Sequence, residues 1–197
     1  RFVFASSSSV YGGATVLPTP TSYQKNPKSP YALQKSVCED FLSMFSTLYG
    51  IETVSLRFFN VFGQNQYGDS AYATAISAWC HAIKNGTSLR SDGTGEQSRD
   101  MCYVDNVVEA NILAAESDRT FCGEQFNVAC GDRVSNNEIL AYFKEHWPKL
   151  TIVNAPARIG DVMHSQADIS ETVDVLGYTP LVRFWDGLSR TTEWWKI

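Results

Sequence analysis

The chain opens on a run that is apolar at every position. Phe2, Val3, Phe4 and Ala5 follow Arg1 directly, without the polar alternation that marks a strand with one wet face. A continuous apolar run is typical of a strand buried on both faces, as in the centre of a parallel sheet. Because a central strand cannot begin a sheet alone, we expect an upstream part of the fold to precede Arg1.

A long helix and a second strand follow this run. Ser29 suits the N-cap of the helix and Pro30 its first turn, and we expect the helix to end at Gly50 after about Tyr49. Residues 51–59 then alternate β-branched and aromatic side chains, which predicts a strand. Strand, helix and strand in this order predict a βαβ unit and therefore a parallel, doubly wound sheet.

The rest of the pattern predicts shorter elements. Helices are expected over residues 71–84, 104–116, 135–147, 170–176 and 184–195, and strands over 88–90, 100–104, 125–129 and 151–153. Ser135 lies three residues before Glu138, which is the spacing of a capping box. The expected fold class is α/β with two interleaved regions, residues 1–60 with about 104–130, and about 61–103 with 131–197.

Composition and charge narrow the function classes. With 44% hydrophobic and 19% charged residues the chain is an ordinary globular one, and its net charge of −5 argues against nucleic acid as a partner. No apolar stretch approaches the roughly 18 residues that span a membrane, and no signal peptide is present, so we expect a cytoplasmic protein. The five cysteines are scattered and odd in number, and the histidines do not cluster with carboxylates, so neither disulfides nor a metal site is predicted.

The candidate chemistry lies where the first strand meets the long helix. Tyr31 and Lys35 are four residues apart and therefore share one face of the helix. A free tyrosine titrates near ~10, and a nearby cation favours its phenolate. Four serines, residues 6–9, end the strand just upstream. The pattern predicts a proton-transfer site that needs a redox cofactor, and its alternative is a packing tyrosine beside a lysine whose stem covers apolar surface.

Five segments in order resemble the extended short-chain dehydrogenase/reductases that act on nucleotide sugars, above all the UDP-hexose 4-epimerases. They are residues 5–12, 29–35, 56–63, 92–100 and 158–165. The resemblance covers nearly the whole chain and implies NAD as cofactor and a UDP-sugar as substrate. The chain lacks the family's Gly-rich turn for the dinucleotide. The resemblance thus implies an incomplete Rossmann-like sheet, the C-terminal half of a dinucleotide-binding domain, and a smaller α/β substrate-binding domain.

The resemblance also implies a role for each residue at the reacting carbon. Tyr31 would take the proton from the sugar 4-hydroxyl while hydride leaves C4 for the nicotinamide, and hydride would then return to the other face of a 4-keto intermediate. Lys35 would hold the nicotinamide ribose, and Ser7 would place a hydroxyl beside the reacting sugar oxygen. Phe59 would lie against the nicotinamide, although its apolar setting also suits a core residue.

The substrate's remaining groups fall to other matched positions. Asn60 would contact the diphosphate, Arg99 and Arg158 would hold it with planar guanidinium groups, and Asp161 would contact or orient that site. Ser165 would lie beside the C2 substituent of the sugar, where a small side chain leaves room for an N-acetyl group. The alternative for each arginine is a surface ion pair with a neighbouring carboxylate.

Ser8 and Ser9 help to choose among the reactions of this family. Family 4,6-dehydratases carry an Asp-Glu pair at these places and the decarboxylases a glutamate, so two serines favour epimerisation, with Ser8 counted among the substrate-binding residues. A UDP-glucuronate epimerase or decarboxylase, and a catalytically silent truncated domain, stay open. We expect self-association, since relatives commonly dimerise through the Tyr31 helix. Glu39 and Asp40 on that helix are expected to face solvent.

Overall fold

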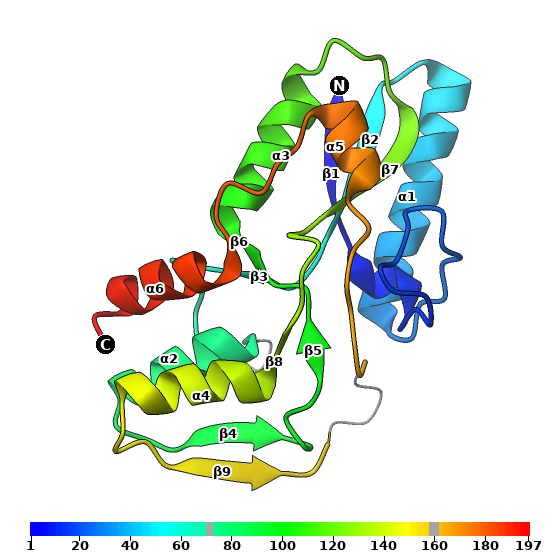
Figure 1. Ribbon diagram of the computed structural model, residues 1–197. Coiled ribbons are helices and arrows are strands. Elements are labelled where there is room, and N and C mark those ends of the chain that lie inside the picture. The colour runs from blue at the N-terminus through cyan, green and yellow to red at the C-terminus, as the bar shows by residue number, and fades with distance from the viewer. Residues whose placement is uncertain (70–72, 158–161) are drawn as a thin grey trace.

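The computed structural model describes residues 1–69, 73–157 and 162–197 (Figure 1). A three-stranded parallel sheet forms its upper part, with β1 (Phe2–Ser7), β2 (Thr53–Phe58) and β7 (Cys122–Val128) in the order β1-β2-β7. Ser7 is paired with Phe58, and Phe58 with Val128, so the three strands end at one carboxyl edge. In open parallel sheets this edge is where ligands bind.

The first apolar run is a strand, as expected, but it is not buried on both faces. Phe2 is 51% exposed, and Ala5 is exposed as well. β1 is the outer strand of the sheet that the described residues form, and nothing among these residues covers its open side. Burial follows from what packs on a strand, and the local pattern does not carry that information.

Two helices cover opposite sides of the sheet (Figure 1). α1 (Pro30–Tyr49) lies on one side and begins and ends as predicted, because the Ser29 hydroxyl accepts the N–H of Ala32 and Gly50 closes the last turn with φ 66°. α3 (Val104–Glu116) lies on the other side, and α5 (Ser170–Leu176) packs beside it against β7. The expected bounds of α3 and α5 are confirmed.

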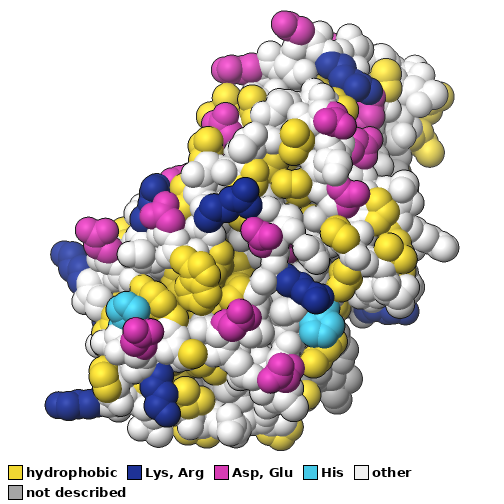
Figure 2. Space-filling view, in the orientation of Figure 1, with side chains coloured by type: hydrophobic (Ala, Val, Ile, Leu, Met, Phe, Trp, Pro, Cys, Tyr) yellow, Lys and Arg dark blue, Asp and Glu magenta, His cyan; other side chains and the backbone are white. Residues whose placement is uncertain are grey.

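α1 buries its small residues and exposes its large ones. The side chains turned to the sheet are Ala32, Ser36, Glu39 and Ser46. The exposed ones include Leu33, Val37, Phe41, Met44, Phe45, Leu48 and Tyr49. In the space-filling view, hydrophobic side chains line the upper right edge over α1, whereas acidic and basic side chains are interspersed across the visible face (Figure 2). An ordinary surface helix has the reverse arrangement.

The lower part of the molecule has its own core. α2 (Ala75–Lys84), α4 (Asn136–His146) and α6 (Phe184–Trp195) pack with the parallel pair β4 (Leu89–Asp92) and β9 (Ile152–Ala155). The predicted capping box of α4 is present. The buried side chains of this core include Phe62, Ile76, Trp79, Leu89, Tyr103, Ile139, Phe143, Leu188 and Trp195.

Short strand pairs connect the two parts. β3 (Val61–Phe62) pairs with β6 (Cys102–Tyr103) in parallel, and β5 (Ser98–Arg99) pairs with β8 (Val134–Ser135) in antiparallel fashion. A 3₁₀ turn, η1 (Ser8–Tyr11), follows β1 directly. Near its C-terminal end the chain packs again on the three-stranded sheet, because α5 contacts β7 and α3. The expected division had assigned residues 131–197 to the second region. Among the described residues, no helix has the length and apolar character needed to cross a bilayer.

Candidate functional site

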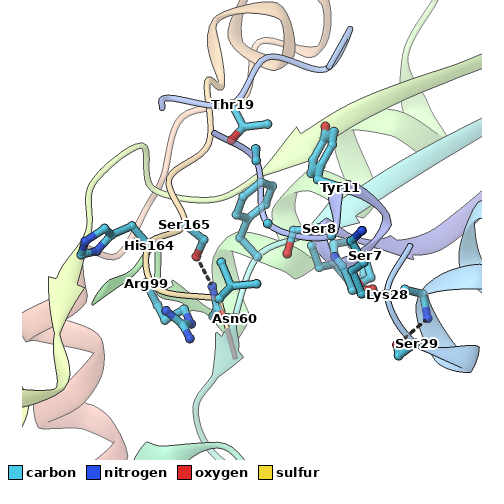
Figure 3. Close-up of a pocket in the computed structure, with 18 residues that line it drawn as sticks. Ser7, Ser8, Tyr11, Thr19, Lys28, Ser29, Asn60, Arg99, His164 and Ser165 are labelled. Atoms are coloured by element: carbon cyan, nitrogen blue, oxygen red, sulfur yellow. Dashed lines mark hydrogen bonds between the residues drawn. The ribbon is translucent and has the colours of Figure 1, made fainter. Parts of the chain in front are cut away.

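A cavity of about 500 Å³ opens at the carboxyl edge of the sheet (Figure 3). Ser7 and Ser8 lie on one side of it, Arg99, His164 and Ser165 on the other, and Asn60 between them. The predicted site residues that line it are Ser7, Ser8, Phe59, Asn60, Arg99 and Ser165. Residues far apart in the sequence thus surround one hollow.

The serine end of the cavity offers hydroxyl groups. The Ser7 hydroxyl accepts the backbone N–H of Ser9 at 3.2 Å, which caps η1 and fixes the Ser7 side chain. The Ser9 hydroxyl is buried and has no hydrogen-bond partner within the described part of the chain. Buried polar atoms are normally paired. Ser9 lines the cavity, but its hydroxyl is turned into the protein interior.

Tyr31 and Lys35 lie on α1 beside this cavity, and neither is among the residues that line it. Tyr31 is 54% exposed and does not itself line the cavity, but Ser29 and Ala32 on either side of it do. The Lys35 ammonium is 5.7 Å from the centre of the Tyr31 ring and donates a hydrogen bond of 2.7 Å to the carbonyl of Ala5 in β1. The two side chains share one helix face and reach toward the open side of β1.

The opposite end of the cavity is suited to an anion. The Arg99 guanidinium donates to the carbonyls of Ser98 at 3.0 Å and Met163 at 3.1 Å. Asn60, in the left-handed region with φ 35°, donates through Nδ2 to the hydroxyl of Ser165 at 3.3 Å (Figure 3). Asparagine tolerates this conformation better than most residues, and strained residues of this kind gather at functional sites.

A second cavity, of about 400 Å³, adjoins the first and shares Asn60 and Arg99 with it. It extends past the first residues of α2 to Gln97 and Asn136. The arginine therefore lies between two hollows, and the N-terminus of α2, which favours negative charge, borders one of them. This arrangement fits an elongated ligand with an anionic middle.

Asp100 holds the anion end together, and the sequence did not single it out as a site residue. Its fully buried carboxylate accepts the backbone N–H groups of Cys130, Gly131 and Ala167 at 2.9, 3.1 and 3.0 Å. Its own N–H donates to the carbonyl of Ser165, and its carbonyl accepts from Asn60. Burial raises the pKa of Asp100 to about 7, against the opposing effect of the three N–H groups.

A buried ion pair lies behind the serine end and corrects one expectation. Glu39 does not face solvent: it is 1% exposed and bound by the guanidinium of Arg57, whereas Asp40 is exposed and pairs with Lys25. The signal that could have revealed the pair is Arg57 itself, the one charged residue of the strand Thr53–Phe58. Such a charge requires a buried partner.

Further residues line the cavity that the sequence did not single out as site residues. They are Tyr11 and Lys28. His164, which the matched segment 158–165 contains, also lines it, and its Nδ1 lies 2.9 Å from the hydroxyl of Ser98. The predicted residues Arg158 and Asp161 lie outside the described part of the chain.

Comparison with known proteins gives consistent matches over this chain. The sequence profile described as "NAD dependent epimerase/dehydratase family" matches residues 1–129. A putative UDP-glucose 4-epimerase of Methanocaldococcus jannaschii is 33% identical over 100% of this chain and 63% of its own length. The UDP-N-acetylglucosamine 4-epimerase of Methanobrevibacter ruminantium, solved with UDP-N-acetylmuramic acid, is 39% identical with a TM-score of 0.91, over 98% of this chain and 62% of that one.

A third match was solved with both a UDP-sugar and NAD. The UDP-glucuronic acid 4-epimerase of Bacillus cereus, in complex with UDP-glucuronic acid and NAD, is 27% identical with a TM-score of 0.90, over 99% of this chain and 61% of that one. The α/β architecture is therefore that of Rossmann-fold epimerases. The chain spans 61–63% of the length of these three proteins.

Proposed function

Because the chain belongs to the NAD dependent epimerase/dehydratase family, we propose that the protein carrying it interconverts UDP-hexoses at C4 with NAD, through a 4-keto intermediate. The observation that supports this most is a cavity with hydroxyl groups at one end and an arginine at the other, beside the helix that carries the Tyr31–Lys35 pair. The matched relatives act on UDP-sugars by their names.

The residues at the serine end carry the proton transfer. Tyr31 takes the proton from the sugar 4-hydroxyl and returns it when the centre has inverted, and the Ser7 hydroxyl hydrogen-bonds the same sugar oxygen. NAD, when bound, supplies the reversible two-electron oxidation at C4. The fixed geometry of Ser7, set by the N–H of Ser9, holds its hydroxyl ready for that oxygen.

The residues present fit the nicotinamide end of NAD. The exposed Tyr31 ring offers an aromatic surface and a hydroxyl beside the cavity, and the ammonium of Lys35 offers further hydrogen-bond donors. Lys35 would hold the ribose, and Phe59 would bound the nicotinamide at the end of β2. The chain has no Gly-rich strand-to-helix turn, since Gly12 and Gly13 lead into a loop, so the fit concerns this end of the cofactor alone.

The adjoining cavities suggest how the UDP-sugar lies. The diphosphate binds at Arg99 and Asn60, with Arg158 and Asp161 as further proposed contacts, and a guanidinium suits a diphosphate by its fork of donors. The sugar then occupies the cavity with the serines, and the nucleoside occupies the cavity beside α2. Ser8 contributes a hydroxyl to the sugar side.

Ser165 makes N-acetylated hexoses acceptable substrates. Its hydroxyl is held by Asn60 at the wall of the sugar cavity, and a serine occupies little volume there. The M. ruminantium relative is a UDP-N-acetylglucosamine 4-epimerase. We therefore infer turnover of UDP-GlcNAc and UDP-GalNAc as well as UDP-glucose.

A UDP-glucuronate substrate is the second candidate. Lys28 lines the sugar cavity, and its ammonium could pair with a uronate carboxylate. The B. cereus relative acts on UDP-glucuronic acid by its name. Decarboxylation and dehydration are less well supported, since Ser8 and Ser9 provide no carboxylate for the extra acid and base chemistry.

The exposed face of α1 supports self-association. Leu33, Val37, Phe41, Met44 and Leu48 follow one another at helical spacing and stay exposed, and an apolar stripe of this kind usually meets a partner. We propose a second copy of the protein as that partner, and light scattering of the full-length protein tests it.

The five cysteines are free thiols, which agrees with a cytoplasmic location.

Turnover of purified full-length protein tests the proposal. We expect conversion of UDP-GlcNAc to UDP-GalNAc with NAD, and faster turnover of this sugar than of UDP-glucuronate. Preference for UDP-glucuronate would favour the second candidate. Calorimetry with UDP separates both from the catalytically silent domain, for which neither turnover nor binding heat at millimolar UDP is expected.

A further inference from the structure

One buried carboxylate connects the two elements that carry the proposed proton-transfer residues. Glu39 follows Lys35 by four residues on α1, as Lys35 follows Tyr31, so the three side chains form one row along the helix. Tyr31 and Lys35 lie beside the cavity, and Glu39 lies at the buried end of the row, next to the sheet.

The Glu39 carboxylate binds both neighbouring strands. The Ser6 hydroxyl donates to Oε1 from β1 at 2.5 Å, and Arg57 donates from β2 to Oε1 and Oε2 at 2.9 and 2.7 Å. Ser6 directly precedes Ser7, and successive side chains of a strand point to opposite faces. Ser6 therefore binds the helix while Ser7 is left to face the cavity.

Arg57 extends the connection to the turn that follows β1. Its Nη1 donates to the hydroxyl of Tyr11 at 3.0 Å and to the carbonyl of Thr21 at 2.8 Å. The Tyr11 hydroxyl donates in turn to Asn127 of β7 at 2.6 Å. Tyr11 belongs to η1, whose first residues are Ser8 and Ser9 of the cavity. The helix row, the strand and the serine turn thus share one hydrogen-bonded network.

A buried ion-pair network of this kind is weak evidence for a stabilising role. Removing two charges from water offsets most of their attraction, and apolar replacements of buried ion pairs are often as stable or more stable. Hydrogen bonds require narrow ranges of distance and angle, so these contacts fix where α1, β1 and η1 lie relative to one another. The small residues on the inner face of α1 would by themselves let the helix shift along the sheet.

We propose that Glu39 and Arg57 are positioning residues that hold Tyr31 and Lys35 in register with Ser7. This inference rests on the proposed epimerase function. Asn60 and Ser165 at the anion end are held directly through Asp100, whereas the pair reaches that end only indirectly, through Tyr11 and Asn127 to the carbonyls of Thr19 and Asp168. Loss of the pair should therefore lower kcat and leave nucleotide binding intact.

The first test is Glu39→Gln in the full-length protein. The amide would place a donor against the Arg57 guanidinium, so we expect kcat to fall about 100-fold, the scale of a misplacement near 1 Å. The affinity for UDP, measured by calorimetry, should stay unchanged. Asp40→Asn is the matched control, because Asp40 is the next residue, is exposed, and pairs with Lys25, whose ammonium also lies 3.7 Å from Glu39 Oε2. This variant should retain the wild-type kcat.

The second test separates positioning from stability. The double variant Glu39→Met with Arg57→Met removes both charges and keeps a similar volume. We expect Glu39→Gln to have a lower Tm than the wild type and the double variant to have a Tm close to that of the wild type. The kcat of the double variant should stay low. If the double variant regained both the Tm and the kcat of the wild type, the pair would act only through stability, and the inference would be overturned.

A third readout does not need turnover. Amide hydrogen exchange over residues 30–40 should be faster in Glu39→Gln than in the wild type, with β2 still protected. Unchanged exchange over that segment would overturn the inference even in a protein with activity. If the wild type shows no epimerisation, the proposed function fails, and hydrogen exchange still decides the positioning role.

Discussion

Both ends of the cavity rest on a buried carboxylate, but the two carboxylates are held differently. Glu39, beneath Tyr31 and Lys35, binds a guanidinium and a hydroxyl from two strands. Asp100, beside Arg99, binds three backbone N–H groups from two loops. The first arrangement sets side chains of neighbouring elements against one another, and the second sets the path of the loops. Substitutions at the serine end should thus lower kcat, whereas substitutions at the anion end should raise KM or change the pH dependence of stability.

The largest effect should come from the serine end. Tyr31→Phe removes the proposed proton acceptor and keeps the ring, so kcat should fall about 10³-fold, within the range of general acid–base catalysis. UDP affinity should stay near that of the wild type. Epimerase assays and calorimetry measure the two quantities.

Tyr49 offers a matched control for this substitution. It lies about five turns further along the same face of α1 and is 67% exposed. Tyr49→Phe should keep the wild-type kcat. A fully active Tyr31→Phe would contradict the proposed role of the phenol.

The next largest effect concerns Asp100 and pH. Its folded pKa of about 7 lies above the ordinary value of 3.8, so the folded protein retains a proton that the unfolded chain releases between these values. Stability from Asp100 is therefore full below pH 4 and is lost as the pH rises through 7, by at most about 4 kcal/mol.

Chemical denaturation of the wild type and Asp100→Asn across pH 4 to 8 measures this slope. Subtracting the variant removes the contribution of carboxyls with lowered pKa values, such as Glu138 beside Ser135, which slope the other way. A difference between the two proteins that does not change over this interval would mean that Asp100 is ionised throughout it.

Arg99→Met tests the anion end directly. Losing a charged donor to a phosphate should raise KM for the UDP-sugar about 10- to 100-fold, since such hydrogen bonds contribute about 1.5–3 kcal/mol. The change in kcat should be smaller. Arg119→Met is the control, because Arg119 is an exposed arginine paired with Glu124. A fall confined to kcat would reverse the comparison between the two ends.

The smallest effect should be one of selectivity. Ser165→Tyr fills part of the sugar cavity, so kcat/KM for UDP-GlcNAc should fall about tenfold more than for UDP-glucose. Competition assays with both sugars measure the ratio. Equal losses for both sugars would mean that Ser165 does not lie beside the C2 substituent.

Much of the local structure could be predicted from the sequence. The bounds of α1, α3, α5 and α6 agree with expectation, and α1 shows why: Ser29 and Gly50 act on backbone groups within a few residues of themselves. The shared helix face of Tyr31 and Lys35 could be predicted in the same way, because spacing along one helix is a local property.

The tertiary structure alone decided burial and the partners of buried charges. Local pattern suggested a central first strand, yet β1 is the outer strand of the sheet that the described residues form. It also suggested a solvated Glu39, which is instead buried against Arg57. Asp100 reaches Ala167, 67 residues away, and Glu39 reaches Ser6, 33 residues away. Caps and helical spacing act within a few residues and can be read along the chain. Desolvation and long-range hydrogen bonds depend on which segments come into contact in the folded protein, and the order of residues along the chain does not determine this by local pattern.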